Sequence, residues 1–178
     1  MYELFILGQL MDHSMTGYAL RKAFTSIAGD DQAISFGTLY PLLDKLAQAK
    51  EISLSFKETE NKRPQKLATI TDKGKKEFMN LASELVTINK QTQLTFLMKI
   101  QFLHLFDQNL QIKILNDFKN FSQGKLDRLK EIKHEIKNNT HMTQEDINDA
   151  LLVKQLQISR AQTQLKWVVE LLNQRKGE

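Results

Sequence analysis

The stretch Ser35 to Ala47, SFGTLYPLLDKLA, decides the fold, because it predicts a short helix with one apolar and one polar face. Ser35 is a favourable N-cap residue. The apolar stripe has spacings of three, one and three residues and consists of Leu39, Leu42, Leu43 and Leu46. At about 100° per residue, the opposite face carries Gly37, Pro41, Asp44, Lys45 and Gln48, with Thr38 and Tyr40 at its edges. We expect the leucines to be buried and the opposite face to be exposed.

Gly37 and Pro41 are unusual inside such a helix and suggest contact with another polymer. Gly37 has no Cβ, so the first-turn amides can approach a phosphate closely. Pro41 lies too deep for an ordinary first-turn proline. We expect it either to bend the helix or to end a tight first turn, and to offer an apolar surface to a thymine methyl. Thr38 and Tyr40 would supply hydroxyl groups, whereas the only strong cation on this face is Lys45. Few base contacts and shape-dependent recognition are therefore expected.

The elements around this helix predict a winged helix-turn-helix. A first helix is indicated by leucines at helical spacing from Leu4 to Leu10, and a second follows Thr16, a plausible N-cap. Residues 52–57 alternate as a half-buried strand does, residues 60–64 read as a polar turn, and residues 66–70 read as a returning strand. Thr71 can cap a further helix. Three helices followed by a hairpin is the element order in which the third helix enters the major groove of DNA. A small α+β domain that docks proteins without binding DNA is the alternative.

Charge supports the same assignment weakly. The chain has 178 residues and a net charge of +4. Between Lys57 and Lys76 there are seven basic residues and three acidic ones, an excess of four around the predicted hairpin. A solvated hairpin with no nucleic-acid partner explains this charge equally well.

Beyond Leu81 the sequence predicts long helices, because proline is absent and glycine occurs only at Gly124 and Gly177. The first is expected to run through Phe96 and Phe106, the second to start near Leu110, and the third to start at Thr143 with a capping-box pattern. Residues of the last helix recur with steps of four and three: Ile147, Leu151, Lys154, Ile158, Ala161, Leu165, Val168 and Leu172. This seam suits either a bundle within one chain or a partner helix from a second copy. Lys154 would snorkel out of the seam or fix its register.

The sequence resembles the PadR family of bacterial transcriptional regulators. Four pieces carry the resemblance in order: residues 6–10 (ILGQL), 16–20 (TGYAL), 35–46 (SFGTLYPLLDKL) and 71–74 (TDKG). Arg63-Pro64 with Lys66, and Trp167 in the last helix, also match the pattern. Three positions depart from it: Thr16 replaces a usual histidine, Lys50 replaces the glycine that ends the recognition helix, and Leu67-Ala68 replaces an aromatic pair.

The resemblance implies a mainly α fold, with an N-terminal winged helix-turn-helix DNA-binding domain over residues 1–80. A C-terminal long-helix domain over residues 81–178 would serve dimerisation and bind an effector. The protein would act as a homodimeric repressor on a palindromic operator in double-stranded DNA, released by a small aromatic effector. The candidate DNA-binding residues are Thr16, Tyr18, Ser35, Gly37, Thr38, Tyr40, Pro41, Lys45, Lys62, Arg63 and Lys66. The candidate dimerisation residues are Ile147, Leu151, Ile158, Leu165, Val168 and Leu172. Candidate effector-binding residues are Phe96, Phe102, Phe106 and Trp167, although aromatic residues at helical spacing are more often core.

Other classes of function find little support. Cysteine is absent, the four histidines are scattered, and no phosphate-binding loop or nucleophile motif occurs, so no catalytic residues, metal site or cofactor are expected and an enzyme is not predicted. No apolar run approaches the roughly 20 residues of a membrane span, and the N-terminus does not read as a signal peptide. The sequence therefore predicts a soluble, cytoplasmic protein.

Overall fold

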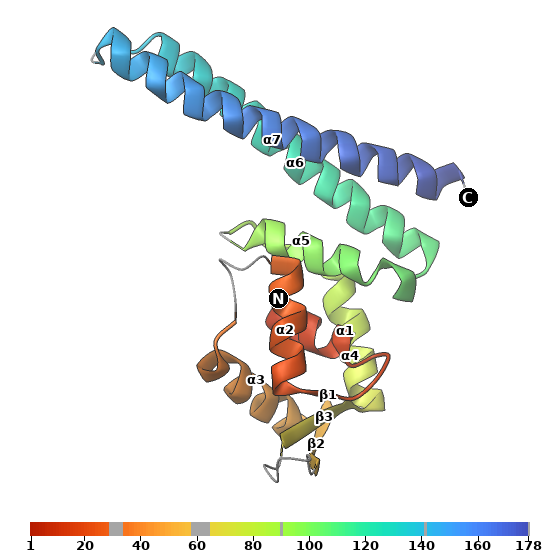
Figure 1. Cartoon of the computed structure of the whole chain (residues 1–178). Coiled ribbons are helices and arrows are strands. Elements are labelled where there is room, and N and C mark those ends of the chain that lie inside the picture. Colours follow the sequence, from red (N-terminus) through yellow and green to blue (C-terminus); the bar gives the residue numbers. More distant parts are fainter. Residues whose placement is uncertain (29–33, 58–64, 90, 141, 178) are drawn as a thin grey trace. The chain divides into compact units, whose positions relative to one another are not determined.

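The computed structural model describes residues 1–28, 34–57, 65–89, 91–140 and 142–177. The chain forms two compact units, Met1–Leu105 and Phe106–Glu178 (Figure 1). The division of the chain at residues 80 and 81 into a DNA-binding and a dimerisation domain stays a prediction. Within the described residues, no helix combines the length and apolarity that crossing a membrane requires.

The first unit has the element order of a winged helix-turn-helix, as the sequence predicts. Its elements are α1 (Tyr2–Gln9), β1 (Met15–Thr16), α2 (Gly17–Ala28), α3 (Phe36–Gln48), β2 (Ile52–Lys57), β3 (Gln65–Ile70), α4 (Asp72–Ser83), α5 (Thr92–Gln101) and the 3-10 helix η2 (Leu103–Leu105). Within this unit α3 and the β2–β3 hairpin, the wing, lie at one end, and α5 lies at the other (Figure 1).

The three strands form an antiparallel sheet in the order β1-β3-β2. Ala68 of the central strand pairs with Leu54 on one side and with Met15 on the other. The sequence did not predict β1, because two residues are too short to show an alternating pattern. Its pairing is accompanied by a hydrogen bond of 2.6 Å between the hydroxyls of Ser14 and Thr69.

The core of the first unit is built from the apolar faces of its helices. Phe5 of α1 meets Phe24 of α2 edge to face, with ring centroids 5.2 Å apart. This packing explains why residue 8 is glycine: a Cβ at Gly8 would lie 2.5 Å from the ring of Phe102. Phe102 also packs edge to face on Phe78 of α4. The glycine in α1 therefore allows the ring that follows α5 to pack against that helix.

Hydrogen bonds and a close backbone contact connect the end of α3 to the start of α4. Lys50 has a φ of 60°, the left-handed conformation in which helices commonly terminate. The amide of Glu51 donates to the Leu46 carbonyl at 2.9 Å. A Cβ on Gly74 would lie 2.0 Å from the Glu51 carbonyl oxygen, so only glycine fits this contact. Thr71 donates to the same carbonyl and accepts from the Gly74 amide at 3.1 Å, which confirms it as the cap of α4.

The second unit is a pair of long helices, α6 (Gln108–Lys137) and α7 (Gln144–Gly177), lying side by side (Figure 1). Asp107 caps α6 by accepting from the Leu110 amide at 2.8 Å. Thr143 caps α7 by accepting from the Asp146 amide at 3.2 Å, as the sequence predicts. The prediction of one long helix through Phe96 and Phe106 was wrong, because α5 ends at Gln101 and the 3-10 helix η2 lies between them. The apolar pattern continues there because the chain stays buried while it turns.

Part of the α7 seam is covered by α6 of the same chain. Leu126 of α6 is buried with Ile158 and Ala161 of α7, and Leu129 and Leu165 pack against them. Lys154 is half-buried and donates to Gln157 of the same helix at 2.8 Å. The assignment of the seam to a dimer interface stays a prediction.

Candidate nucleic-acid interface

The two faces of α3 lie largely as the sequence predicts. Leu39, Leu43 and Leu46 are at most 2% exposed, whereas Leu42, the fourth leucine of the predicted stripe, is half-buried. Gly37, Thr38, Tyr40, Pro41, Lys45 and Gln48 are exposed. Ser35 caps the helix, because its hydroxyl accepts from the Thr38 amide at 3.1 Å and lies 2.9 Å from the Thr38 hydroxyl. The outward surface at the start of α3 is therefore rich in hydroxyl groups.

Gly37 is not required by the packing of the protein itself. A Cβ at this position would meet only the Ser35 hydroxyl oxygen, at an ordinary 3.7 Å. The helix continues through Pro41, so this proline does not end it. Since Pro41 has no amide hydrogen, the Gly37 carbonyl cannot receive the usual bond from four residues ahead. Pro41 therefore leaves the Gly37 carbonyl, at the exposed start of α3, without its usual helical partner.

An aromatic stack connects α2 to the start of α3. The Arg21 guanidinium lies over the Phe36 ring at 4.7 Å, and Phe36 stacks on Tyr40 with centroids 5.7 Å apart. Arg21 is also held by a hydrogen bond of 3.1 Å from its Nε to the Ile34 carbonyl. A Cβ on Gly17 would lie 3.1 Å from Tyr40 Cε1, so Gly17 leaves room for the tyrosine. Arg21 and Phe36 were not among the candidate residues, because their contact depends on how two helices pack.

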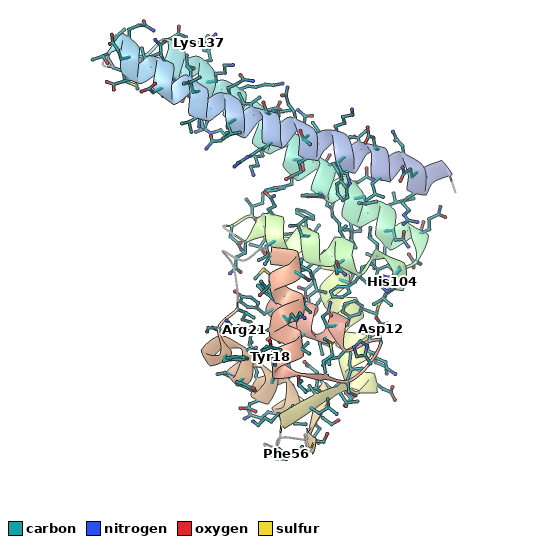
Figure 2. The ribbon with its side chains drawn as sticks, viewed as in Figure 1. Asp12, Tyr18, Arg21, Phe56, His104 and Lys137 are labelled. Carbon is teal, nitrogen blue, oxygen red and sulfur yellow. The ribbon has the colours of Figure 1, made fainter. Side chains whose placement is uncertain are left out.

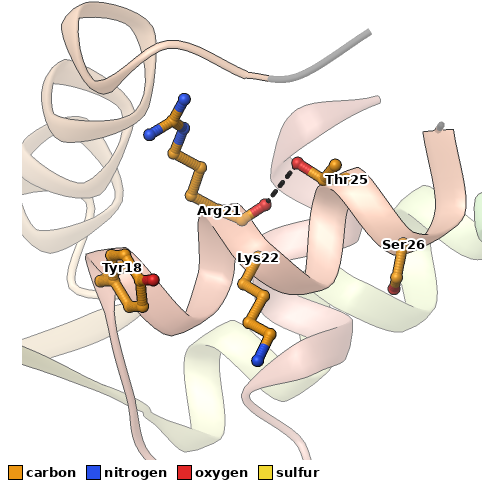
Figure 3. Close-up of a pocket in the computed structure, with 5 residues that line it drawn as sticks. All are labelled: Tyr18, Arg21, Lys22, Thr25 and Ser26. Atoms are coloured by element: carbon orange, nitrogen blue, oxygen red, sulfur yellow. Dashed lines mark hydrogen bonds between the residues drawn. The ribbon is translucent and has the colours of Figure 1, made fainter. Parts of the chain in front are cut away.

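The exposed side of α2 adds a hollow of about 370 Å³, lined by Tyr18, Arg21, Lys22, Thr25 and Ser26. Figure 3 shows Arg21 and Lys22 extending in different directions from α2, so the two cations do not converge. The Tyr18 side chain is 66% exposed. Thr16, the other candidate in this region, accepts from the Ala19 amide at 3.3 Å and so caps α2.

Lys45 is an exposed cation with an acidic partner from another helix. Its Nζ lies 2.6 Å from Glu3 Oε1 at the start of α1. The hydrogen bond and the negative charge of Glu3 raise the pKa of Lys45 above its ordinary value. Contact between Lys45 and a phosphate would therefore compete with Glu3.

The wing contributes a second paired cation. Lys66 of β3 lies 2.9 Å from Asp44 of α3, and so connects the wing to the outward face of the helix. Phe56 of β2 is opposite Lys66 in the sheet and is 72% exposed; it marks the wing in Figure 2. Lys62 and Arg63, the other two wing candidates, lie outside the described residues.

The remaining candidates lie in different surroundings. Phe96 and Phe102 are buried in the first unit, Phe106 is buried in the second, and Trp167 is 44% exposed on α7. Of the dimerisation candidates, Ile147, Ile158, Val168 and Leu172 are buried, while Leu151 and Leu165 are half-buried. The described part of the chain contains no group of three histidine, aspartate or glutamate residues that could hold a metal ion.

Comparison with known proteins identifies the family. The transcriptional regulator PadR-like family matches residues 6–80. A crystal structure of Bacillus subtilis PadR in complex with operator DNA is 21% identical, covers 97% of this chain and 96% of its own, and has a TM-score of 0.47. The same protein in complex with p-coumaric acid is also 21% identical, with 98% of both chains covered and a TM-score of 0.41. The structure of smu.1704 from Streptococcus mutans UA159 is 31% identical over 45% of this chain and 71% of its own, with a TM-score of 0.40.

The search of curated proteins found no match. The family match spans the helices and hairpin that surround the exposed face of α3, from Ile6 in α1 to Asn80 in α4. The chain belongs to the PadR-like family of transcriptional regulators.

Proposed function

We propose that this transcriptional regulator binds double-stranded DNA as a repressor, with α3 in the major groove and the wing on the flanking phosphates. The observation that best supports the proposal is the orientation of α3: Leu39, Leu43 and Leu46 are buried, and the small, hydroxyl-rich side of the helix faces outward. Gly37 strengthens the proposal, because the protein's own packing leaves room for a side chain there. A close approach by a phosphate supplies the reason for a glycine.

The protein is proposed to act as a homodimer on a palindromic operator, with a cytoplasmic location. A two-fold pair of winged domains would read two half-sites of the same sequence. Support comes from apolar side chains of α7 that α6 leaves exposed: Leu152 is 71% exposed, Leu156 53% and Trp167 44%. Their spacing of four and eleven residues places them along one side of the helix. This exposed stripe is a second surface for a partner copy, besides the seam expected from the sequence.

Release by a small aromatic effector is the third part of the proposal, and family membership supports it. Trp167 borders an open hollow of about 490 Å³ on α7, so its indole is available for stacking. Phe96 and Phe102 are each 3% exposed, because other residues of the protein cover their rings. A ligand would reach them only after the core had opened.

DNase footprinting on the DNA upstream of the protein's own gene tests the proposal. We expect protection of two half-sites related by a two-fold axis, at nanomolar protein and physiological salt, and a smaller protected fraction when an active aromatic compound is added. Equal binding to this DNA and to random DNA would contradict sequence-specific regulation. It would favour the alternative, a winged-helix module that docks a protein partner without reading DNA.

A further inference from the structure

Asp44 is an unexpected residue on a surface that faces DNA. Its side chain is 49% exposed on the outward side of α3, between Pro41 and Gln48. A carboxylate there is repelled by phosphates and lowers non-specific affinity. Exposed ion pairs add little to folding stability, so its pairing with a lysine does not account for its presence.

Lys66 holds the Asp44 carboxylate in a defined place. The Lys66 Nζ lies 2.9 Å from Asp44 Oδ1, and its side chain is 36% exposed. Lys66 belongs to β3, the central strand, which pairs with β2 over its whole length and with β1 at Leu67 and Ala68. Asp44 itself is on the turn of helix that follows Pro41. The two groups are thus carried by regular elements, with a cation to compensate the carboxylate near the DNA.

A carboxylate in the major groove can make one type of base contact. When ionised it only accepts hydrogen bonds. Among the base edges in that groove, cytosine N4 and adenine N6 donate, whereas the O6 of guanine and the O4 of thymine accept. A carboxylate therefore favours a base with an exocyclic amino group and disfavours a keto group at the same position.

We propose that Asp44 is a specificity-determining residue that reads an exocyclic amino group, cytosine N4 or adenine N6, in each half-site, and that Lys66 is the positioning residue for its carboxylate. This inference rests on the proposed function, since it requires α3 to lie in the major groove. It assigns base readout to a face without arginine, where Gly37, Thr38 and Tyr40 offer small or hydroxyl groups. Asp44 supplies the discrimination between bases that these groups lack.

The experiment measures binding of wild type, D44N, D44S and K66M to the footprinted operator and to a set of single substitutions in both half-sites. Cytosine-to-thymine and adenine-to-guanine transitions replace an amino group by a keto group while keeping the size of the base. For wild type, one position in each half-site should lose about 5- to 150-fold in affinity on this change. In D44N, whose amide both donates and accepts, the loss at that position should shrink to less than about threefold. Whether the sensitive base is cytosine or adenine distinguishes the two sources of the amino group.

Three other variants, D72N, K66M and D44S, separate base readout from a simple effect of charge. D72N removes an exposed carboxylate that is paired with Lys75 on α4, and it should keep the wild-type pattern at every position. K66M should reduce the discrimination between bases at the same operator position as D44N, because the Asp44 carboxylate has lost its positioning partner. Its thermal transition should be retained. D44S keeps the inference testable through a smaller side chain in case D44N does not fold.

The outcomes are distinct. A loss of discrimination confined to one position per half-site supports the inference. A rise in affinity by the same factor for every DNA, with all positional preferences intact, would show that Asp44 acts only by repelling phosphate and would overturn the inference while leaving the proposed function in place. Wild-type protein with no preference for any promoter fragment over random DNA would overturn both.

Discussion

Lys45 of α3 forms an ion pair with Glu3 of α1, with 2.6 Å between Nζ and Oε1. These residues are 42 positions apart in the chain. The only strong cation on the outward face of α3 is therefore already compensated when the protein is free. A phosphate that binds Lys45 must replace Glu3 as its partner.

Replacing Glu3 with Gln should strengthen DNA binding. The variant keeps the shape of the side chain but removes its charge, so Lys45 becomes available to a phosphate. We expect affinity to rise by a similar factor for operator and random DNA, and the slope of log affinity against log salt to steepen by up to about one. Fluorescence anisotropy across a salt series measures both. D72N is the matched control and should behave as wild type; an E3Q curve that overlays wild type would place Lys45 outside the interface.

Gly37 should matter for binding and not for folding. G37A adds a Cβ that meets only the Ser35 hydroxyl at 3.7 Å, and alanine favours helix over glycine by up to about 1 kcal/mol. The melting temperature should therefore stay or rise, while DNA affinity falls because the first turn can no longer approach a phosphate closely. G74A is the contrasting control, since its Cβ would lie 2.0 Å from the Glu51 carbonyl oxygen. It should lower the melting temperature. A G37A protein that binds as wild type does would rule out close backbone contact.

Two variants separate the packing role of Tyr40 from its proposed role in DNA binding. Y40F keeps the ring between Phe36 and Gly17 and removes only the hydroxyl. It should retain the thermal transition and lose about 1.5 to 3 kcal/mol of DNA-binding free energy, the scale of a hydrogen bond to a charged group. Y40A also removes the ring and should lower the melting temperature. Equal affinity of Y40F and wild type would restrict Tyr40 to a structural role.

The exposed stripe of α7 should decide the oligomeric state. L156E places a charge at a side chain that is 53% exposed, so folding of the helix pair should be preserved while a second copy is repelled. Light scattering after gel filtration should show a monomer for L156E and the proposed dimer for wild type. I158E is the control for folding, because Ile158 is buried against Leu126 and a charge there should unfold the α6–α7 pair. A dimer that survives L156E would move the interface to another face.

The sequence predicted most of what is local in this fold. Ser35, Thr71 and Thr143 were expected as caps, and each accepts a hydrogen bond from an amide three residues ahead. Such caps depend on residues within one turn of helix, so they can be recognised without tertiary information. The strand pattern of residues 52–57 was equally readable, because alternation reflects one buried face.

The break after α5 and the strand β1 were missed for the opposite reason. Phe102 continues the apolar pattern of α5, although α5 ends at Gln101 and the Phe102 ring packs against Gly8 and Phe78. Hydrophobic periodicity predicts that a residue is buried, but it does not predict which other residues cover it. The same limit hid Arg21 and Phe36, whose contact joins two helices at the candidate interface.

By itself the sequence determined most of the helices, the wing strands and the outward face of α3, since caps and hydrophobic periodicity act over a few residues. Only the tertiary structure decided which charges on that face are compensated. Lys45 meets Glu3 and Lys66 meets Asp44, across 42 and 22 positions of the chain. The physical reason is that an exposed ion pair adds too little free energy to impose a recognisable pattern on the sequence. Its two partners are brought together by the packing of the leucine-backed helix against the rest of the first unit.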